Sequence, residues 1–185
     1  MSEKCQRVLY RPGYSRVMSE ESTVSPYLLR VDSPIGRLEL TSDGTAVTSL
    51  LIAKNGELPL DGIDDNPTAV LDTAAAQLAE YFAGERRDFD VPTAPKGTVF
   101  QKQVWEQLSG LGWGEVASYG DIGRATGRPA AGRAVGGAVG ANPITIIVPC
   151  HRVLAGNGRI TGYSGGNGIP TKVWLLDHEG IPHTV

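Results

Sequence analysis

Residues 118–139 (SYGDIGRATGRPAAGRAVGGAV) contain the pattern that decides the fold of the C-terminal part of the chain. Ser118 has the position of a helix N-cap, and Asp121 follows three residues later, where a capping box has its acidic partner. This start predicts a short helix over 119–125, which the TGRP segment ends, and a second helix over 130–139. Two helices joined by a short turn containing glycine are typical of a helix-turn-helix unit. The pattern is common in helical proteins, so alone it is a weak sign of DNA binding.

The second of these helices has almost no side-chain bulk, since most residues of 130–139 are glycine or alanine. Such a helix can approach another backbone closely, but it offers few groups for hydrogen bonds to base edges in the major groove. Two interpretations stay open. Either the small face packs inside the protein while Arg133 makes a surface ion pair, or the small residues lie along DNA and Arg133 projects into it. Both can hold on different faces of the helix.

A cysteine follows the longest apolar run of this half. Residues 144–148 (ITIIV) predict a buried strand, which ends at Pro149 just before Cys150. Burial in apolar surroundings raises the pKa of a thiol, so a reactive Cys150 needs a base. His151 follows directly, but adjacent residues of an extended chain point to opposite sides, so a turn at Pro149 is needed to bring the imidazole to the sulfur. Glu179, at the end of a predicted C-terminal helix, is a candidate by charge to hold that imidazole.

The first half of the chain has a different pattern. After a polar, irregular segment over 1–25, which we expect to be poorly ordered, short alternating or apolar runs from Tyr27 onward predict antiparallel strands. Residues 68–82 then repeat apolar side chains at helical spacing, and a PTAPKG stretch has the composition of a linker. We therefore predict an α/β protein, with a small N-terminal α/β domain over 26–92 and a mostly helical C-terminal domain over 93–185.

Length, composition and cysteine content exclude several classes of protein. The 185 residues are 41% hydrophobic and 20% charged with a net charge of −3, which fits a globular chain rather than a disordered one or a fibre. No apolar run approaches the roughly 20 residues of a membrane span, and the N-terminus has no signal-peptide pattern, so we expect a cytoplasmic protein without membrane association. Cys5 and Cys150, with three scattered histidines, predict neither a disulfide framework nor a metal site, and Cys5 is interpreted as an incidental free thiol.

Charge is distributed unevenly along the chain. Residues 96–160 carry seven basic and three acidic side chains, whereas 1–95 carry nine basic and fifteen acidic ones. A basic segment of this kind fits a polyanion-binding surface, and it fits an ordinary fluctuation of surface charge equally well. The Gly-rich stretch 156–168 likewise fits either a connecting loop or one wall of a flat-ligand site that includes Tyr163. From the residues alone, thiol transfer and papain-like hydrolysis both stay open.

Several stretches together resemble one family. IIVPCHRV, preceded by GRAVGGAVGANP and followed by GYSGG and WLLDHEG, is similar to the O6-alkylguanine-DNA alkyltransferases, or methylated-DNA–protein-cysteine methyltransferases. SPIGRLEL and YFAGE extend the resemblance more loosely, so that it runs from about Tyr27 to Gly180. It implies a ribonuclease-H-like N-terminal domain and a C-terminal domain with a helix-turn-helix. It also implies DNA repair by one stoichiometric (suicide) transfer of the alkyl group from a flipped O6-alkylguanine to the protein's own cysteine. No cofactor is implied, and a structural zinc site of some members is absent, because residues 6–149 hold neither cysteine nor histidine.

Carried over to the matching positions, the resemblance implies a role for each reacting group. Cys150 accepts the alkyl group, His151 takes the thiol proton through a water, and Glu179 orients His151. Asn142 braces the turn that carries the cysteine, and Tyr119 donates a proton to the departing guanine. The thioether that forms is not hydrolysed, so a second turnover is not expected.

The resemblance also implies contacts with the base and the duplex. The carbonyls of Val148 and Cys150, with the wall formed by Tyr163 and Ser164, hold the flipped guanine, and Arg133 fills the gap that the base leaves. The helix-turn-helix uses the minor groove, in agreement with the small residues of its second helix. Further DNA contacts are implied for Ala131, Gly132, Gly136 and Ser118. The expected partner is double-stranded DNA containing alkylated guanine, bound by a monomer. Cooperative assembly on DNA, activity on O4-alkylthymine and a nuclear location in a eukaryote stay open.

Two alternatives differ in kind from alkyl transfer. A non-catalytic lesion binder of the same fold would bind the damaged base without chemistry, but relatives of that kind lack the cysteine that this chain keeps at Cys150. A Cys–His hydrolase of unrelated fold would turn over repeatedly and would have no use for Arg133.

Overall fold

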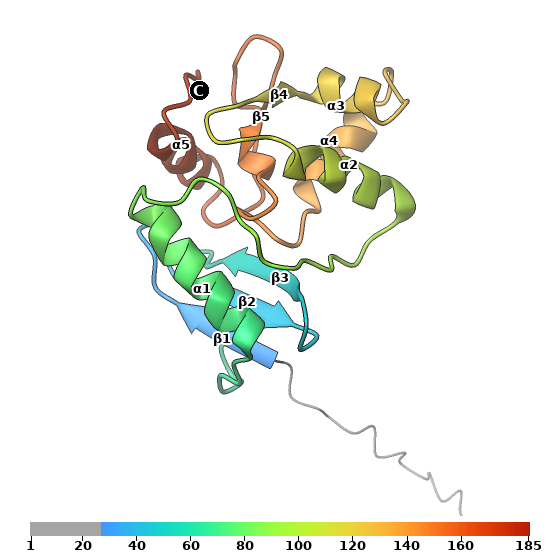
Figure 1. Cartoon of the computed structure of the whole chain (residues 1–185). Coiled ribbons are helices and arrows are strands. Elements are labelled where there is room, and N and C mark those ends of the chain that lie inside the picture. Colours follow the sequence, from blue (N-terminus) through green and yellow to red (C-terminus); the bar gives the residue numbers. More distant parts are fainter. Residues whose placement is uncertain (1–26) are drawn as a thin grey trace, which may run out of the picture.

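The computed structural model describes residues 27–185 and begins with a three-stranded antiparallel sheet (Figure 1). Its strands are β1 (Tyr27–Val31), β2 (Leu38–Ser42) and β3 (Val47–Ile52), which lie in the order β1-β2-β3. The prediction of antiparallel strands in this part of the chain is therefore confirmed. The predictions about residues 1–25, including Cys5, lie outside the described residues.

One helix, α1 (Ala69–Phe82), packs against this sheet. Its apolar residues recur every three or four positions, so side chains such as Leu78 and Tyr81 fall on one face and are buried. The helix ends just before Gly84, whose φ of +77° is the left-handed conformation that glycine tolerates at helix ends. The C-terminal end of α1 reaches α5 (Ile169–His178) of the second half (Figure 1).

The second half is mostly helical, as predicted. It begins with α2 (Val99–Ser109), which starts at a capping box. The elements that follow are β4 (Ala117–Ser118), α3 (Tyr119–Ala125), α4 (Gly132–Gly140), the 3-10 helix η1 (Cys150–Arg152), β5 (Val153–Leu154) and α5. β4 and β5 pair in parallel, which holds the start of α3 beside the chain that leaves η1.

The predicted helix-turn-helix is present, with α3 packed against α4. Ser118 Oγ accepts a hydrogen bond from Asp121 N at 3.1 Å, and Asp121 Oδ2 accepts one from Ser118 N at 2.8 Å, so the capping box forms. The second helix begins at Gly132 rather than two residues earlier. Ala130 lies in the turn, where Ala131 N donates to Arg128 O at 3.0 Å, and Ala131 is the N-cap with a φ of −94° and a ψ of 32°.

Residues 144–148 form a turn, so the prediction of a buried strand there is wrong. Val148 N donates to Ile144 O at 3.0 Å, and Ile146 has a φ of +71°, which no strand residue adopts. The side chains are buried as expected, but the apolar run reports burial and not conformation. The amide of Asn142 fixes the turn, because it donates to Val148 O at 2.7 Å and accepts from Ile144 N at 3.1 Å.

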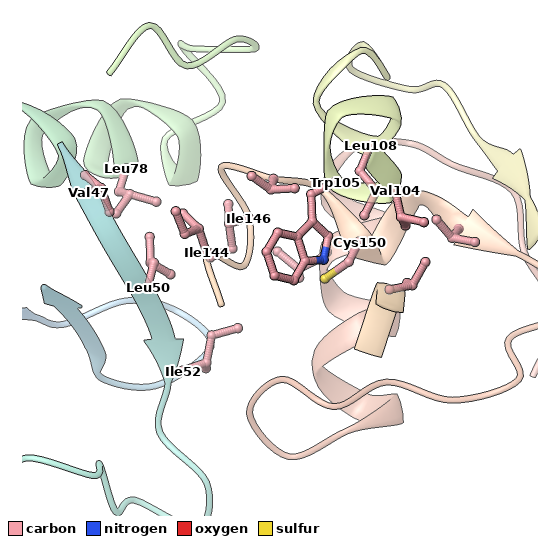
Figure 2. Close-up of a cluster of buried hydrophobic side chains, with 14 of the residues drawn as sticks. Val47, Leu50, Ile52, Leu78, Val104, Trp105, Leu108, Ile144, Ile146 and Cys150 are labelled. Carbon is pink, nitrogen blue, oxygen red and sulfur yellow. The ribbon is translucent and has the colours of Figure 1, made fainter. Parts of the chain in front are cut away.

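A single apolar core joins the two halves, and Figure 2 shows the turn in its middle. Ile144 and Ile146 lie between Leu50 of β3 on one side and α2 on the other. The backbone continues this link, since Leu50 N donates to Pro143 O at 2.8 Å and Thr145 N donates to Leu50 O at 3.1 Å. The N-terminal sheet therefore supports the turn that leads to Cys150.

The predicted fold class is confirmed: a small N-terminal α/β part is followed by a mostly helical part with a helix-turn-helix. Within residues 27–185, no helix has the length and apolar character needed to cross a membrane. Over the same residues, histidine, cysteine and acidic side chains do not gather in threes as metal ligands would.

Candidate active site

A cavity of about 280 Å³ lies beside α4 and contains the thiol. Five of the residues singled out from the sequence line it, namely Tyr119, Gly136, Cys150, Tyr163 and Ser164. The rest of its lining comes from Val139, Gly140, Thr161, Gly162 and Lys172. A larger and more open groove of about 720 Å³ runs alongside and shares Gly140 and Ser164 with it, but it does not reach the thiol.

Cys150 is the first residue of η1 and is only 3% exposed. Burial raises the pKa of its thiol, while Asn142, Tyr163 and Lys172 act in the opposite direction with a smaller effect. The free thiol is therefore protonated at neutral pH. A nucleophilic role requires that a neighbouring base removes this proton.

His151 and its carboxylate partner Glu179 both have fully buried side chains. His151 Nε2 and Glu179 Oε1 lie 2.8 Å apart. Arg152 donates to the same carboxylate, from Nε to Oε2 at 2.7 Å and from Nη2 to Oε1 at 2.9 Å. Burial opposes the ionisation of Glu179, but the hydrogen bonds from His151 and Arg152 outweigh it and hold the pKa of Glu179 at about 2. The candidate by charge is therefore an ionised carboxylate in direct contact with the imidazole.

This contact decides the protonation of the imidazole. An ionised carboxylate only accepts hydrogen bonds, so the proton of neutral His151 is assigned to Nε2 and Nδ1 is left as the acceptor. Burial lowers the pKa of His151, against the opposing effect of Glu179, so the ring is neutral near pH 7. Nδ1 is buried and has no hydrogen-bond partner within residues 27–185. The ring is thus poised to take a proton at Nδ1.

A further donor to the same carboxylate comes from the first half of the chain. Tyr81 Oη, near the end of α1, donates to Glu179 Oε1 at 2.8 Å. Burial, with the negative charge of Glu179, raises the pKa of Tyr81 far above its ordinary value, so the hydroxyl stays protonated. The sequence analysis did not predict this contact, because Tyr81 and Glu179 are 98 positions apart.

Two polar side chains tie the cavity walls together. Thr161 Oγ1 donates to Tyr119 Oη at 3.2 Å, which leaves the phenolic proton of Tyr119 free to be donated elsewhere. Ser164 Oγ donates to Gly140 O at 2.8 Å, which fastens the Gly-rich loop to the end of α4. Residues 161–164 of the loop therefore line the cavity, which favours the interpretation as a wall of a site.

Lys172 is a cavity residue that the sequence analysis missed. Its side chain is 1% exposed, and Nζ donates to Val153 O at 2.6 Å. Burial lowers the pKa of Lys172 to about 8, although the neighbouring Cys150 thiolate would raise it. At pH 7 it is still mostly a cation next to the thiol. A lone lysine in a predicted helix normally lies on the surface, so the sequence held no signal for its burial.

One face of α4 packs inside the protein and the other is exposed, so the two interpretations of its small residues apply to different faces. Val135 and Ala138 are buried against the protein, and Trp105 Nε1 donates to Ala138 O at 2.8 Å. Gly132 and Arg133 are exposed at the start of the helix. Among residues 27–185 the Arg133 side chain has neither an ion pair nor a hydrogen bond, so the structure does not support the interpretation as a surface ion pair.

Of the seven basic residues in 96–160, fewer are exposed and unpaired than the sequence suggests. Arg152 is buried against Glu179, and Arg124 is paired with Asp121. The basic residues of this segment that stay exposed without an ion pair to the described residues are Lys96, Lys102, Arg128, Arg133 and Arg159. Arg128 stacks over the ring of Phe100, 4.6 Å from its centroid.

One implied site residue lies elsewhere. Val148 lines a different hollow, together with Ile147, and not the cavity that holds the thiol. Its carbonyl already accepts from Asn142 Nδ2 at 2.7 Å and from Cys150 N at 2.8 Å, so both lone pairs serve the turn. The geometry therefore does not support a contact between the Val148 carbonyl and a flipped base.

Known families match both halves of the chain, in order. Residues 27–95 match the ribonuclease-like domain of 6-O-methylguanine DNA methyltransferase, and residues 99–181 match the DNA-binding domain of the same protein family. Together the two matches cover most of the described residues.

Individual relatives agree with these matches. The methylated-DNA–protein-cysteine methyltransferase of Mycolicibacterium paratuberculosis is 45% identical, over 82% of this chain and 92% of the relative. The solved O6-methylguanine methyltransferase of Mycobacterium tuberculosis has a TM-score of 0.75 at 43% identity, covering 83% of this chain and 92% of that one. Mycobacterium tuberculosis OGT in complex with DNA has a TM-score of 0.72 at 44% identity, covering 81% and 90%.

Proposed function

Because the chain belongs to the 6-O-methylguanine DNA methyltransferase family, we propose that it acts as a methylated-DNA–protein-cysteine methyltransferase. It repairs DNA by moving the alkyl group of O6-alkylguanine to Cys150. The observation that carries the proposal is the buried contact of His151 with Glu179 at 2.8 Å, directly after a cysteine that lines a cavity. A Cys–His pair held by a carboxylate is the arrangement that activates a thiol.

The thiol is activated by proton transfer at the moment of reaction. His151 Nδ1 takes the proton of Cys150 through a bridging water, and Glu179 stabilises the imidazolium that results. The thiolate sulfur forms a bond to the alkyl carbon while the bond from that carbon to O6 breaks. Lys172 is a cation beside the sulfur and favours the thiolate. The thioether product is stable to water, so each protein molecule reacts once.

The leaving group is a guanine anion, which departs more readily when it is protonated. Tyr119 lines the cavity, and its phenolic proton is not used by Thr161, so it is available to a ring nitrogen of the departing base. Ser164 and Tyr163 form the wall against which the base lies, and the carbonyl of Cys150 offers an acceptor. Asn142 keeps the turn before the nucleophile in place.

The damaged base must leave the duplex to reach a thiol that is 3% exposed. Flipping costs a few kcal/mol of stacking and pairing, and an inserted side chain offsets part of this cost. Arg133 supplies that side chain, because it is exposed and free of partners among the described residues. Gly132 and Gly136 beside it, with Ala131 and Ser118 at the helix starts, allow close approach to a minor groove.

The test is a reaction with a short duplex that contains one O6-methylguanine, followed by the intact mass of the protein. We expect the mass gain of one methyl group in place of a proton, on the peptide containing Cys150, with no further gain on longer incubation. Lesion binding without a mass change would indicate a non-catalytic binder. Repeated product formation by unmodified protein would indicate a hydrolase. Either result would overturn the proposal.

The wider expectations for this family are part of the same proposal. The protein acts as a monomer on double-stranded DNA, in the cytoplasm and on the DNA found there. Analytical ultracentrifugation with and without the modified duplex tests the monomer and separates it from cooperative assembly. A second duplex with O4-methylthymine tests whether the cavity of about 280 Å³ also accepts that base.

A further inference from the structure

The carboxylate of Glu179 is held by four hydrogen bonds, and one of them crosses between the halves of the chain. Oε1 accepts from His151 Nε2 at 2.8 Å and from Arg152 Nη2 at 2.9 Å, while Oε2 accepts from Arg152 Nε at 2.7 Å. Tyr81 Oη donates the fourth bond, to Oε1 at 2.8 Å. The atom that contacts the imidazole is therefore the atom that contacts the tyrosine.

Tyr81 is itself held rigidly. Its side chain is fully buried, and its backbone carbonyl accepts a hydrogen bond from His178 Nε2 at 2.8 Å. Four aromatic rings surround it with centroids between 5.1 and 5.5 Å away, those of Phe82, Phe89, Trp113 and His178. The hydroxyl stays protonated, so near neutral pH its one charged partner is the carboxylate. The position of Oε1 is thus set by α1 as well as by the chain around η1.

On the basis of the function proposed above, we infer that Tyr81 is a positioning residue for alkyl transfer, through which the N-terminal half holds Glu179 in the orientation that aligns His151. The hydroxyl donates to the same Oε1 that contacts the imidazole, so it restrains rotation of the carboxylate. It also takes a share of the negative charge of Glu179, which limits how strongly the carboxylate attracts a proton to His151.

Two effects follow from loss of the hydroxyl. A carboxylate with one donor fewer is held less well, so His151 is aligned less often and transfer slows. The same carboxylate carries more negative charge, so the imidazolium is favoured and His151 becomes neutral only at a higher pH. Arg152 and Lys172, the other charged groups that face His151, are unchanged, which leaves the shift attributable to Glu179. A tyrosine that only fills space would produce neither the shift nor its dependence on Glu179.

The test uses the full chain with Tyr81→Phe, Glu179→Gln and the double variant. Tyr27→Phe is the matched control, because Tyr27 is 38% exposed on β1 and its hydroxyl has no hydrogen bond to the described residues. Two rate constants are measured as functions of pH below each variant's melting temperature. One is single-turnover methyl transfer from modified duplex, and the other is carbamidomethylation of the Cys150 peptide by iodoacetamide.

We expect Tyr81→Phe to slow transfer about tenfold on the plateau, and to move the acidic limb of the pH profile up by about half a unit. In the Glu179→Gln background the same change is expected to alter the rate by less than about twofold and to leave the limb in place. Tyr27→Phe should match the wild type. An unchanged rate and limb in folded Tyr81→Phe, or the same loss in both backgrounds, would overturn the inference.

The iodoacetamide reaction keeps the two proposals separable. If the wild type does not accept a methyl group from duplex DNA, the proposed function fails. The pH dependence of Cys150 labelling still reports whether Tyr81 acts through Glu179 on the thiol. If the wild type accepts the methyl group and Tyr81→Phe changes neither reaction, the inference alone fails. A Tyr81→Phe protein that does not fold is replaced by Tyr81→Met, which also removes the hydroxyl and whose flexible side chain fills the buried site. The same slower transfer and raised limb are expected, and an unchanged rate and limb in folded Tyr81→Met would overturn the inference.

Discussion

The buried group around Glu179 and the exposed face of α4 are built in opposite ways. Glu179 and His151 are almost fully buried, and the carboxylate has four hydrogen bonds. Gly132 and Arg133 are exposed, and the Arg133 side chain contacts no charged partner within residues 27–185. The first region is satisfied within the protein. In the second, the exposed backbone and the Arg133 side chain remain available to bind another molecule.

This difference predicts where substitutions act. Removing one member of a satisfied buried group leaves a charge or polar atom without its partner, which costs stability and function together. Removing a side chain from the exposed face costs the free protein little, so any effect must show in the complex with DNA. The following changes test this division, beginning with the largest effect.

Cys150→Ser separates chemistry from binding. A hydroxyl is a far weaker nucleophile toward an alkyl carbon than a thiolate, so we expect no methyl transfer, while the near-isosteric side chain should leave the cavity and DNA affinity unchanged. Intact mass measures transfer, and titration of a labelled modified duplex measures affinity. Residual transfer to the protein would show that the nucleophile is misassigned.

Glu179→Gln removes the charge at the centre of the buried group. The folded pKa of Glu179, about 2, lies below the unfolded value of about 4.3. Its ionised form therefore stabilises the protein above about pH 4, and this contribution, about 3 kcal/mol, is lost as pH falls from about 4 toward 2. We expect the free energy of unfolding of the variant to lie at least that far below the wild type at pH 6, and the gap to narrow toward pH 2.

Urea denaturation at a series of pH values gives this gap. Glu57→Gln is the control, since Glu57 is exposed and forms no ion pair with the described residues, and its gap should stay near zero. A gap for Glu179→Gln that does not change with pH would contradict the ionised state assigned to the carboxylate.

Arg133→Ala should act on DNA and not on the fold. We expect repair of modified duplex to slow about tenfold or more, while reaction with the free modified base changes little, because only the duplex needs a substitute for the flipped base. Arg159→Ala removes another exposed charge and is the control for general electrostatics. Equal losses on duplex and free base would remove Arg133 from its proposed role.

Gly132→Ala has the smallest expected effect. A Cβ at Gly132 meets no atom within 4 Å, and alanine favours a helix, so the free protein should gain about 0.5–1 kcal/mol of stability. Gly137→Ala meets open space on the same helix and should gain a similar amount. If the face of Gly132 lies against DNA, duplex affinity should fall for Gly132→Ala more than for Gly137→Ala. Thermal unfolding and DNA titration of both variants decide this.

Periodic patterns made most of the fold predictable, while contacts between distant residues were not. Strands β1 to β3, helix α1 and the helix-turn-helix each follow from local spacing and capping residues such as Ser118 and Asp121. Residues 144–148 misled, because β-branched residues favour a strand while the side chain of Asn142 imposes a turn. An apolar run predicts burial more reliably than it predicts a strand.

The candidate site was predictable where a short motif contained it. Cys150 and His151 are neighbours in one motif, and Glu179 lies downstream in a second, so residue types and order made them candidates, while the family resemblance gave each its role. Tyr81 could not be recognised in this way, since it acts through a hydroxyl brought in by folding. Lys172 could not either, since the other residues that line its cavity come from four separate segments. Such residues carry no local signal, because their surroundings exist only in the folded chain.

The turn before Cys150 has a consequence for the order of folding. It is tied to β3 by bonds between residues far apart in the chain, such as that from Thr145 Oγ1 to Leu50 O at 2.8 Å, across 95 positions. Contacts of this kind close long loops, so they are slow to form compared with the helices. A chain whose helices are already in place but whose halves have not yet met lacks the bonds from Leu50 to the turn and from Tyr81 to Glu179. The reactivity of Cys150 during refolding should therefore change when the two halves meet.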